Sequence, residues 1–188
     1  MSVTVSKRLL SIEDYHTMGE VGILPEKGVE LIHGEIIDMS PIGEKHLGTV
    51  NKMNRMLNKL YDDNVLIQVQ NPIITSNLSE PEPDLCILRH RADWYGKGIA
   101  KAGEALAVIE VADSSLEYDQ EVKAPLYAES GIPEYWLVNL RRDQIERYTQ
   151  PEGGEYKRLQ RYDLDDMIPL PALDQPIAVQ DLLLPAEE

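Results

Sequence analysis

Three charged residues near the middle of the chain have the types that metal-dependent hydrolysis requires. Asp84 follows the segment EPEP, Glu110 lies inside the apolar run ALAVIEVA, and Lys123 follows in DQEVKAPLY. Two carboxylates that are held together repel each other, and a shared proton or a bound cation relieves the repulsion. Mg²⁺ takes oxygen ligands and is often held by only one or two carboxylates and several waters. With a lysine beside them, two such carboxylates could bind a metal that activates water to split a phosphodiester.

The two acidic residues are expected to meet if their strands are neighbours. Pro81 and Pro83 impose an extended lead into Asp84, and the apolar residues around Glu110 predict a fully buried strand. If the two strands are antiparallel, the beginning of one lies beside the end of the other, which brings both carboxylates to one sheet edge. The alternative is that Asp84 caps its strand while Glu110 pairs with an arginine, because a buried carboxylate needs a partner.

A helix is predicted over LEYDQEVKAPLYAES, residues 116–130, and it can present the lysine to this site. Asp119, Lys123 and Tyr127 stand at i, i+4 and i+8, so they share one stripe of that helix. The alternative is a surface ion pair between Asp119 and Lys123, which stabilises a helix by only ~0.3 to 0.5 kcal/mol.

The remaining patterns predict elements of alternating type that would position these residues. An α/β fold with a mixed β-sheet and helices packed on it is therefore expected. Ser11 and Asp14 form a capping-box pattern, His33 and Gly34 form the turn of a predicted hairpin, and Gly131 is placed to end the third helix. Helices are predicted over 11–20, 44–61 and 116–130, strands over 64–70, 84–90, 105–112, 134–140, 144–149 and 156–162, and a strand or short helical turn within 174–188.

Composition limits the classes of function. The length of 188 residues suits one domain. No apolar run approaches the ~18 residues of a membrane span, and the polar start has no signal-peptide core, so we expect a cytoplasmic protein with no membrane partner. The only cysteine, Cys86, rules out an internal disulfide and a cysteine-built zinc site. The net charge of -15 disfavours loose adsorption to nucleic acid, so any contact with DNA must rely on local positive residues such as Arg89, Arg91, Lys97 and Lys101.

Four residues in a fixed order carry a family resemblance. Glu30 in VELIHGEI, Asp84 in PEPDL, Glu110 in VIEVADSS and Lys123 in DQEVKAPLYAESGIPEYWLV resemble the restriction-endonuclease-like PD-(D/E)XK superfamily. The similarity is to a branch of endonucleases abundant in cyanobacteria, known as domain of unknown function 820 or the Uma-two type, and it runs from about Ser11 to Tyr148.

The resemblance implies a restriction-endonuclease-like mixed sheet flanked by helices. It implies one domain over 1–188, with a core of about 11–148 and C-terminal strands and a tail in 149–188. It further implies Mg²⁺, with Mn²⁺ as a substitute, held by Asp84 and Glu110. The catalytic set would be Glu30, Asp84, Glu110 and Lys123, with His46 and Tyr127 as accessory residues. For His46, the alternative is an ordinary histidine on a helix surface.

The chain departs from the superfamily pattern at two places. The superfamily places its lysine two residues after the glutamate, where this chain has Ala112, so Lys123 would take that role from the following helix. The branch often has Ser-Pro-Ser where this chain has Asp113, Ser114 and Ser115, and the extra acid could repel phosphate.

The sequence therefore predicts a magnesium-dependent endonuclease that hydrolyses DNA phosphodiester bonds and forms a homo-oligomer, a dimer or larger. The alternative is a catalytically idle nuclease fold that serves as a binding or assembly module. The presence of Asp84, Glu110 and Lys123 together favours the enzyme, because an idle descendant is expected to have lost at least one of them.

Overall fold

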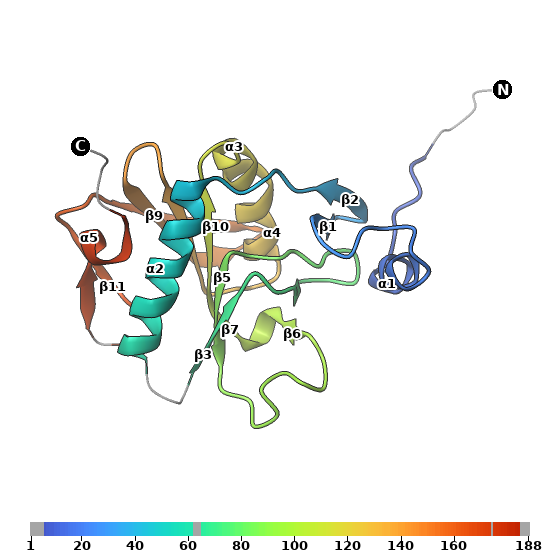
Figure 1. The fold of residues 1–188 in the computed structure, drawn as a ribbon, viewed down its shortest axis with the longest axis horizontal. Helices are drawn as coiled ribbons and strands as arrows, with labels where there is room; N and C mark the ends of the chain where they lie inside the picture. Colours follow the sequence, from blue (N-terminus) through green and yellow to red (C-terminus); the bar gives the residue numbers. More distant parts are fainter. Residues whose placement is uncertain (1–5, 62–64, 174, 185–188) are drawn as a thin grey trace.

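The centre of the molecule is a six-stranded β-sheet with helices on both faces (Figure 1). The computed structural model describes residues 6–61, 65–173 and 175–184. The strand order is β10-β9-β8-β7-β5-β3, and only β7 and β8 pair in parallel, so the sheet is mixed as predicted. Its strands are β3 (Val65–Val69), β5 (Leu85–Arg89), β7 (Ala105–Ala112), β8 (Glu134–Asn139), β9 (Gln144–Glu152) and β10 (Glu155–Tyr162).

The two faces of the sheet carry separate apolar cores. Along β7, Ile109 and Val111 pack in the core beneath α2 (Glu44–Leu60) and α5 (Val179–Leu182), whereas Val108 and Ala112 pack in the core beneath α4 (Ala124–Glu129). Side chains alternate between the faces of a strand. Glu110 therefore projects from the face that α4 covers.

Helix α2 packs one apolar stripe against the sheet. Val50, Met53 and Leu57 are buried there, at the spacing of one helical face. Leu47 is 52% exposed, since it stands in the first turns of the helix, ahead of the residues that cover the sheet.

The predicted helix over 116–130 is a continuous helical segment that contains a π turn. It consists of α3 (Leu116–Tyr118), the π turn η2 (Asp119–Lys123) and α4. A π turn adds a residue to a helical turn and is frequent at functional sites. Gly131 ends the segment with φ of 75°, the left-handed conformation expected of a helix-ending glycine.

The N-terminal part forms a helix and the predicted hairpin. Helix α1 (Ile12–Glu20) begins at the Ser11 capping box, and the hairpin joins β1 (Val29–Ile32) to β2 (Glu35–Asp38). Gly34 has φ of 78°, and a Cβ at this position would lie 2.6 Å from Leu9 Cβ. The hairpin thus packs closely against the chain before α1.

Several short elements were not predicted, because segments of two or three residues carry no periodic signal. The C-terminal segment was predicted to form a strand or a short helical turn, and it forms one of each, a short strand followed by the helical turn α5. Of the residues in predicted elements, Asn64, Asp174 and 185–188 lie outside the described part. The additional elements are β4 (Ile73–Ile74), β6 (Ala100–Lys101), the 3₁₀ turn η1 (Ala102–Glu104), β11 (Met167–Pro169) and β12 (Pro176–Ala178).

Candidate active site

Asp84 and Glu110 lie beside each other where β5 and β7 meet. The two strands are antiparallel neighbours, as expected, with Leu85 opposite Ile109. The backbone N–H of Asp84 lies 3.4 Å from Glu110 Oε2 and donates to it, and the backbone N–H of Val111 donates to Asp84 Oδ2 at 2.9 Å. Each carboxylate therefore accepts a hydrogen bond from the backbone of the other strand.

Lys123 joins two buried carboxylates. It is the last residue of the π turn, its side chain is only 6% exposed, and its Nζ donates to Glu110 Oε1 at 3.0 Å and to Glu30 Oε1 at 2.8 Å. A lysine that replaces its hydration with two carboxylates is held rigidly, since its charge is offset and two of its three N–H donors are paired there. The surface ion pair with Asp119 was the wrong alternative, and so was the pairing of Glu110 with an arginine.

Glu30 enters the site from the N-terminal hairpin. It belongs to β1, its side chain is 2% exposed, and its Oε1 accepts the backbone N–H of Glu82 at 2.7 Å as well as the Lys123 ammonium. The contact with Glu82 ties the hairpin to the segment that leads into Asp84. The structure thus brings Glu30 to the lysine side of the cluster.

Tyr127 and His46 contact one acid each. The Tyr127 hydroxyl is buried on α4 and donates to Glu110 Oε1 at 2.7 Å. His46 Nε2, from the first turn of α2, lies 2.9 Å from Asp84 Oδ2, which places this histidine at the site and not on an open helix surface. His46 Nδ1 is buried and has no hydrogen-bond partner among the described residues.

Gln70 is a neighbour of the site that the sequence analysis missed. Its backbone N–H donates to the Asp84 carbonyl at 3.1 Å, and its side-chain Nε2 lies 3.3 Å from Asp84 Oδ1. It has φ of 47° directly after β3. The pairing of β3 with β5 brings it there, and no motif in the sequence marks that pairing.

The cluster contains more acid than base. Burial raises the pKa of Glu110 to about 8, although the Lys123 ammonium opposes the shift. Burial alone would lower the pKa of Lys123, but the charges of Glu110 and Glu30 outweigh it, so the pKa of the lysine is raised. Burial likewise raises the pKa of Asp119 to about 6, against the hydrogen bond from Ser115. The surplus carboxylate can be neutralised by a proton or by a cation.

The two departures from the superfamily pattern have defined places in the structure. Ala112 is fully buried beside Asn139 of β8, and Lys123 delivers its ammonium to Glu110 from the helix above. Asp113 is exposed and pairs with Arg141 at 3.0 Å, so its charge is offset outside the cluster.

A metal at this site would have few protein ligands. Within residues 6–61, 65–173 and 175–184, no three histidine, cysteine, aspartate or glutamate side chains are arranged to hold one metal ion. The pair of Asp84 and Glu110 remains, which matches a cation that keeps most of its waters.

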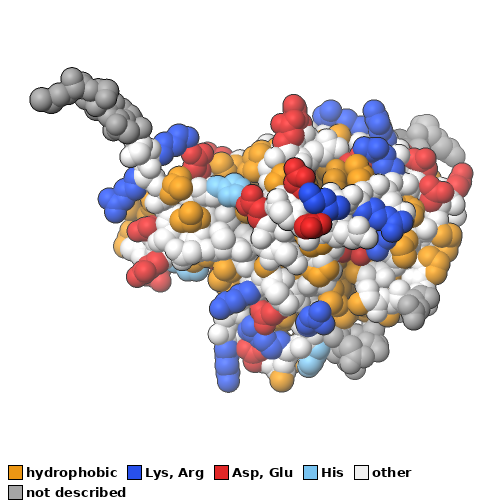
Figure 2. All heavy atoms as spheres, turned by 180° about the vertical axis from the view of Figure 1, so that it is seen from behind, with side chains coloured by type: hydrophobic (Ala, Val, Ile, Leu, Met, Phe, Trp, Pro, Cys, Tyr) orange, Lys and Arg blue, Asp and Glu red, His pale blue; other side chains and the backbone are white. Residues whose placement is uncertain are grey.

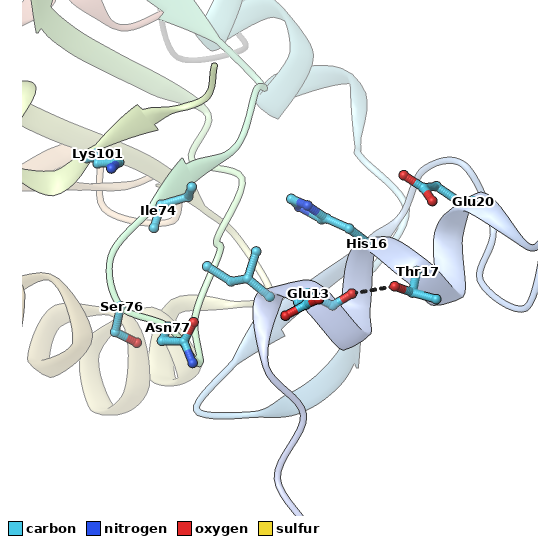
Figure 3. Close-up of a pocket in the computed structure, with 9 residues that line it drawn as sticks. Glu13, His16, Thr17, Glu20, Ile74, Ser76, Asn77 and Lys101 are labelled. Atoms are coloured by element: carbon cyan, nitrogen blue, oxygen red, sulfur yellow. Dashed lines mark hydrogen bonds between the residues drawn. The ribbon is translucent and has the colours of Figure 1, made fainter. Parts of the chain in front are cut away.

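A groove lies apart from the acid cluster, beneath α1. It has a volume of about 590 Å³, and Figure 3 shows Glu13, His16 and Glu20 on its helical side, with Ser76, Asn77 and Lys101 opposite. His16 Nε2 lies 2.9 Å from the buried carboxylate of Glu80. Carboxylates line this groove, which makes it a poor place for a phosphate chain.

Across the same described ranges, no helix is long and apolar enough to cross a membrane.

Comparisons with known proteins show the family of the chain and a similar fold. A family model, Uma2, described as "Putative restriction endonuclease", matches residues 12–180. The fold is similar to the crystal structure of a "putative nuclease belonging to DUF820" from Anabaena variabilis, with a TM-score of 0.66 and 16% sequence identity over 92% of this chain and 97% of that chain. No protein with a curated description matches the chain. Since the family model covers most of the sequence, the chain belongs to the Uma2 family.

Proposed function

We propose that the chain is a magnesium-dependent endonuclease that hydrolyses DNA phosphodiester bonds and works as a homo-oligomer. The family match and the nuclease-like fold support the class of nuclease. The observation that carries the proposal is the contact of Lys123 Nζ with Glu110 Oε1, directly beside Asp84. This set of two carboxylates and one cation can both bind a metal and stabilise negative charge.

The donor set fits a hard divalent cation. Asp84 presents Oδ1, whose one side-chain contact in the described structure is the long one to Gln70, and Glu110 presents Oε2. Mg²⁺ commonly binds one or two carboxylates and completes its shell with waters and substrate phosphates. When bound, the metal would lower the pKa of water and offset charge on the phosphate. Mn²⁺ prefers similar oxygen donors and should substitute.

Each residue around the two carboxylates has a distinct role in this proposal. Lys123 holds the attacking water or the developing negative charge. Glu30 and Tyr127 position other groups, because Glu30 fixes the ammonium of Lys123 while the Tyr127 hydroxyl fixes the carboxylate of Glu110. His46 fixes the carboxylate of Asp84 from the opposite side.

Single-turnover cleavage tests the proposal. Labelled DNA and RNA are incubated with protein and Mg²⁺, Mn²⁺ or chelator, and we expect cleavage of DNA with either metal and none with chelator. Asp84→Asn and Glu110→Gln should abolish it. Asp113→Asn is the matched control, because it removes the same charge from an exposed residue close in sequence to Glu110. Absence of metal-dependent cleavage by wild type would favour the idle binding module.

A further inference from the structure

The end of β5, β6 and the loop that joins them, residues 89–101 and called the loop below, gather positive charge on an acidic protein. Residues 89–101 contain four lysines and arginines and a single aspartate, in a chain with a net charge of -15. Figure 2 shows several Lys and Arg side chains, with Asp and Glu side chains among them, on the lower lobe of the molecule, where Figure 1 places this loop. The loop is therefore a favourable place for a polyanion. Its charged residues are Arg89, Arg91, Asp93, Lys97 and Lys101.

Arg91 organises the loop from inside. Its Nε donates to Asp93 Oδ1 at 2.6 Å, one of its terminal nitrogens donates to the Gly98 carbonyl at 2.8 Å, and its guanidinium lies 4.0 Å from the ring centre of Tyr95. The single aspartate is thus neutralised within the loop. Lys97 makes no ion pair in the described part of the chain, so its charge remains available, whereas Lys101 faces the groove that Glu13 and Glu20 line.

Trp94 stands at the tip in a backbone conformation that tryptophan rarely adopts. Trp94 and Tyr95 have φ of 53° and 62°, and the N–H of Gly96 donates to the Asp93 carbonyl at 2.9 Å to close the turn. Two successive residues with positive φ define a turn that normally takes glycine, asparagine or aspartate. The Trp94 side chain is 62% exposed, and its ring meets the His90 ring edge-on at 5.5 Å. Neither backbone preference nor core packing accounts for a tryptophan here.

We propose that the loop 89–101 binds a single strand of nucleic acid, with Trp94 stacked on an unpaired base and Lys97 against a phosphate. Exposed aromatic rings beside basic side chains are how proteins hold single strands without reading their sequence. Such stacking requires an unpaired base, which a duplex does not offer. The proposal rests on the proposed nuclease function, because the same nucleic acid would reach the acid cluster.

The contact is separate from the point of cleavage. The loop follows the end of β5, whereas Asp84 precedes its beginning, so the two are about 17 Å apart along a five-residue strand. A substrate must span this distance to touch both. The loop therefore acts as an anchor that raises affinity for longer strands.

The fluorescence of Trp94 can be used to measure this contact. It contains two tryptophans, Trp94 and the fully buried Trp136. Titrating the wild type with (dT)12 or (rU)12 in chelator should quench Trp94 fluorescence while Trp136 gives a constant background. Equal quenching by both oligomers would assign the contact to single strands in general, and a difference would show that the loop distinguishes the DNA oligomer from the RNA oligomer.

Variants separate stacking from charge. With labelled oligonucleotide, Trp94→Ala should weaken binding about tenfold and Trp94→Phe should keep most of the affinity, because a base stacks on either aromatic ring. Lys97→Gln should reduce the slope of log affinity against log salt by ~0.7, as expected for one phosphate contact on a single strand. Lys157→Gln, which removes an exposed lysine of β10, is the matched control and should change binding little.

Three results would overturn the proposal: unchanged affinity of Trp94→Ala, a duplex of equal length that binds as tightly as the single strand, or polyglutamate that displaces the oligonucleotide as well as (dT)12 does. The last would assign the loop to an acidic protein partner. Trp94-dependent binding without cleavage under Mg²⁺ would remove the proposed nuclease function alone. Cleavage with Trp94-independent binding would remove the loop contact alone.

Discussion

At the scale of single residues, the candidate site is a balance of buried charges. The Lys123 ammonium offsets the negative charges of Glu30 and Glu110, whose side chains are nearly excluded from water. Removing one partner of a buried ion pair leaves an uncompensated charge and costs about 3 to 5 kcal/mol, far more than losing a surface pair. The lysine thus contributes to stability as well as to the proposed chemistry.

We therefore expect Lys123→Met to lower the free energy of unfolding by about 3 to 5 kcal/mol and to slow cleavage by ~10²-fold or more. The double variant with Glu30→Gln should recover much of the stability, because it also removes the stranded negative charge, while cleavage stays low. Urea unfolding and single-turnover cleavage measure the two effects. Cleavage that recovers together with stability would show that Lys123 only supports the fold.

Buried carboxyls make the stability of the metal-free protein depend on pH. The folded pKa of Glu110 is about 8, above its ordinary value of 4.5, so between these values the folded state binds more protons than the unfolded state. By linkage, the free energy of unfolding falls as pH rises from about 5 to 8. Unfolding in chelator at several pH values should show this fall, and Glu110→Gln should flatten it. An equal slope in the variant would assign the effect to other groups.

The acidic pair was predictable from the sequence, whereas its surroundings were not. Asp84 and Glu110 stand in recognisable strand contexts, so their pairing followed from the antiparallel register. The burial of Lys123 was not visible, because an Asp119–Lys123 spacing looks the same on a surface helix and on a buried one. Gln70 and the turn at Trp94 gave no signal, since one depends on strand pairing and the other contradicts the usual preferences of its turn.

At the scale of elements, the hairpin of β1 and β2 delivers Glu30, and its turn sets the hairpin's position. The N–H of Gly34 donates to the Leu78 carbonyl at 2.7 Å, and the Gly34 carbonyl accepts from the Leu10 N–H at 2.9 Å. The turn is thus fixed on both sides by backbone. A shift of this turn would move the carboxylate that holds Lys123.

We expect Gly34→Ala to be considerably more destabilising than Gly28→Ala. Both positions have positive φ, which costs about 1 to 2 kcal/mol for a residue with a Cβ. The Cβ at Gly28 meets open space, whereas the Cβ at Gly34 would overlap Leu9. Thermal unfolding of both variants isolates the overlap, and cleavage should fall further in Gly34→Ala. Equal melting temperatures of the two variants would show that the segment before α1 moves away from the added Cβ without a loss of stability.

The π turn is a second element-scale feature that links sequence to site. The sequence predicts a helix over the right residues, yet spacing alone does not distinguish a π turn from an α turn. The structure places Asp119 and Lys123 at its two ends, and both are buried. Its position beside Glu110 agrees with the tendency of π turns to occur at functional sites.

At the scale of the whole molecule, a preformed cation site should be detectable as a higher thermal stability in the presence of the metal. A ligand that binds only the folded state raises stability in proportion to the logarithm of its concentration. We expect millimolar Mg²⁺ or Mn²⁺ to raise the melting temperature of wild type relative to chelator, and to have no such effect on Asp84→Asn. Calorimetry provides the measurement. A shift that persists in Asp84→Asn would place the bound metal elsewhere.

The proposed homo-oligomer would be expected to bury some of the exposed apolar side chains. Most of the large ones lie in the N-terminal quarter of the chain: Leu9, Val21, Ile23, Met39, Ile42 and Leu47. Light scattering should give the mass of a dimer or larger assembly, and Ile23→Glu should reduce it. Met167→Glu, at an exposed apolar residue in the C-terminal part, is the control. A wild-type mass of one chain would contradict the expectation.

The pairing of Glu30 with Lys123 also has an expected consequence for the order in which the contacts of the site form during folding. These residues are separated by 93 positions in the sequence, and contacts between distant segments form after local ones because closing a long loop costs entropy. Asp84 and Glu110 can meet when β5 and β7 pair, but Lys123 gains its second acid only when the hairpin docks. We therefore expect the centre to be completed late in folding, so that a partly folded copy would lack the assembled groups of the proposed nuclease.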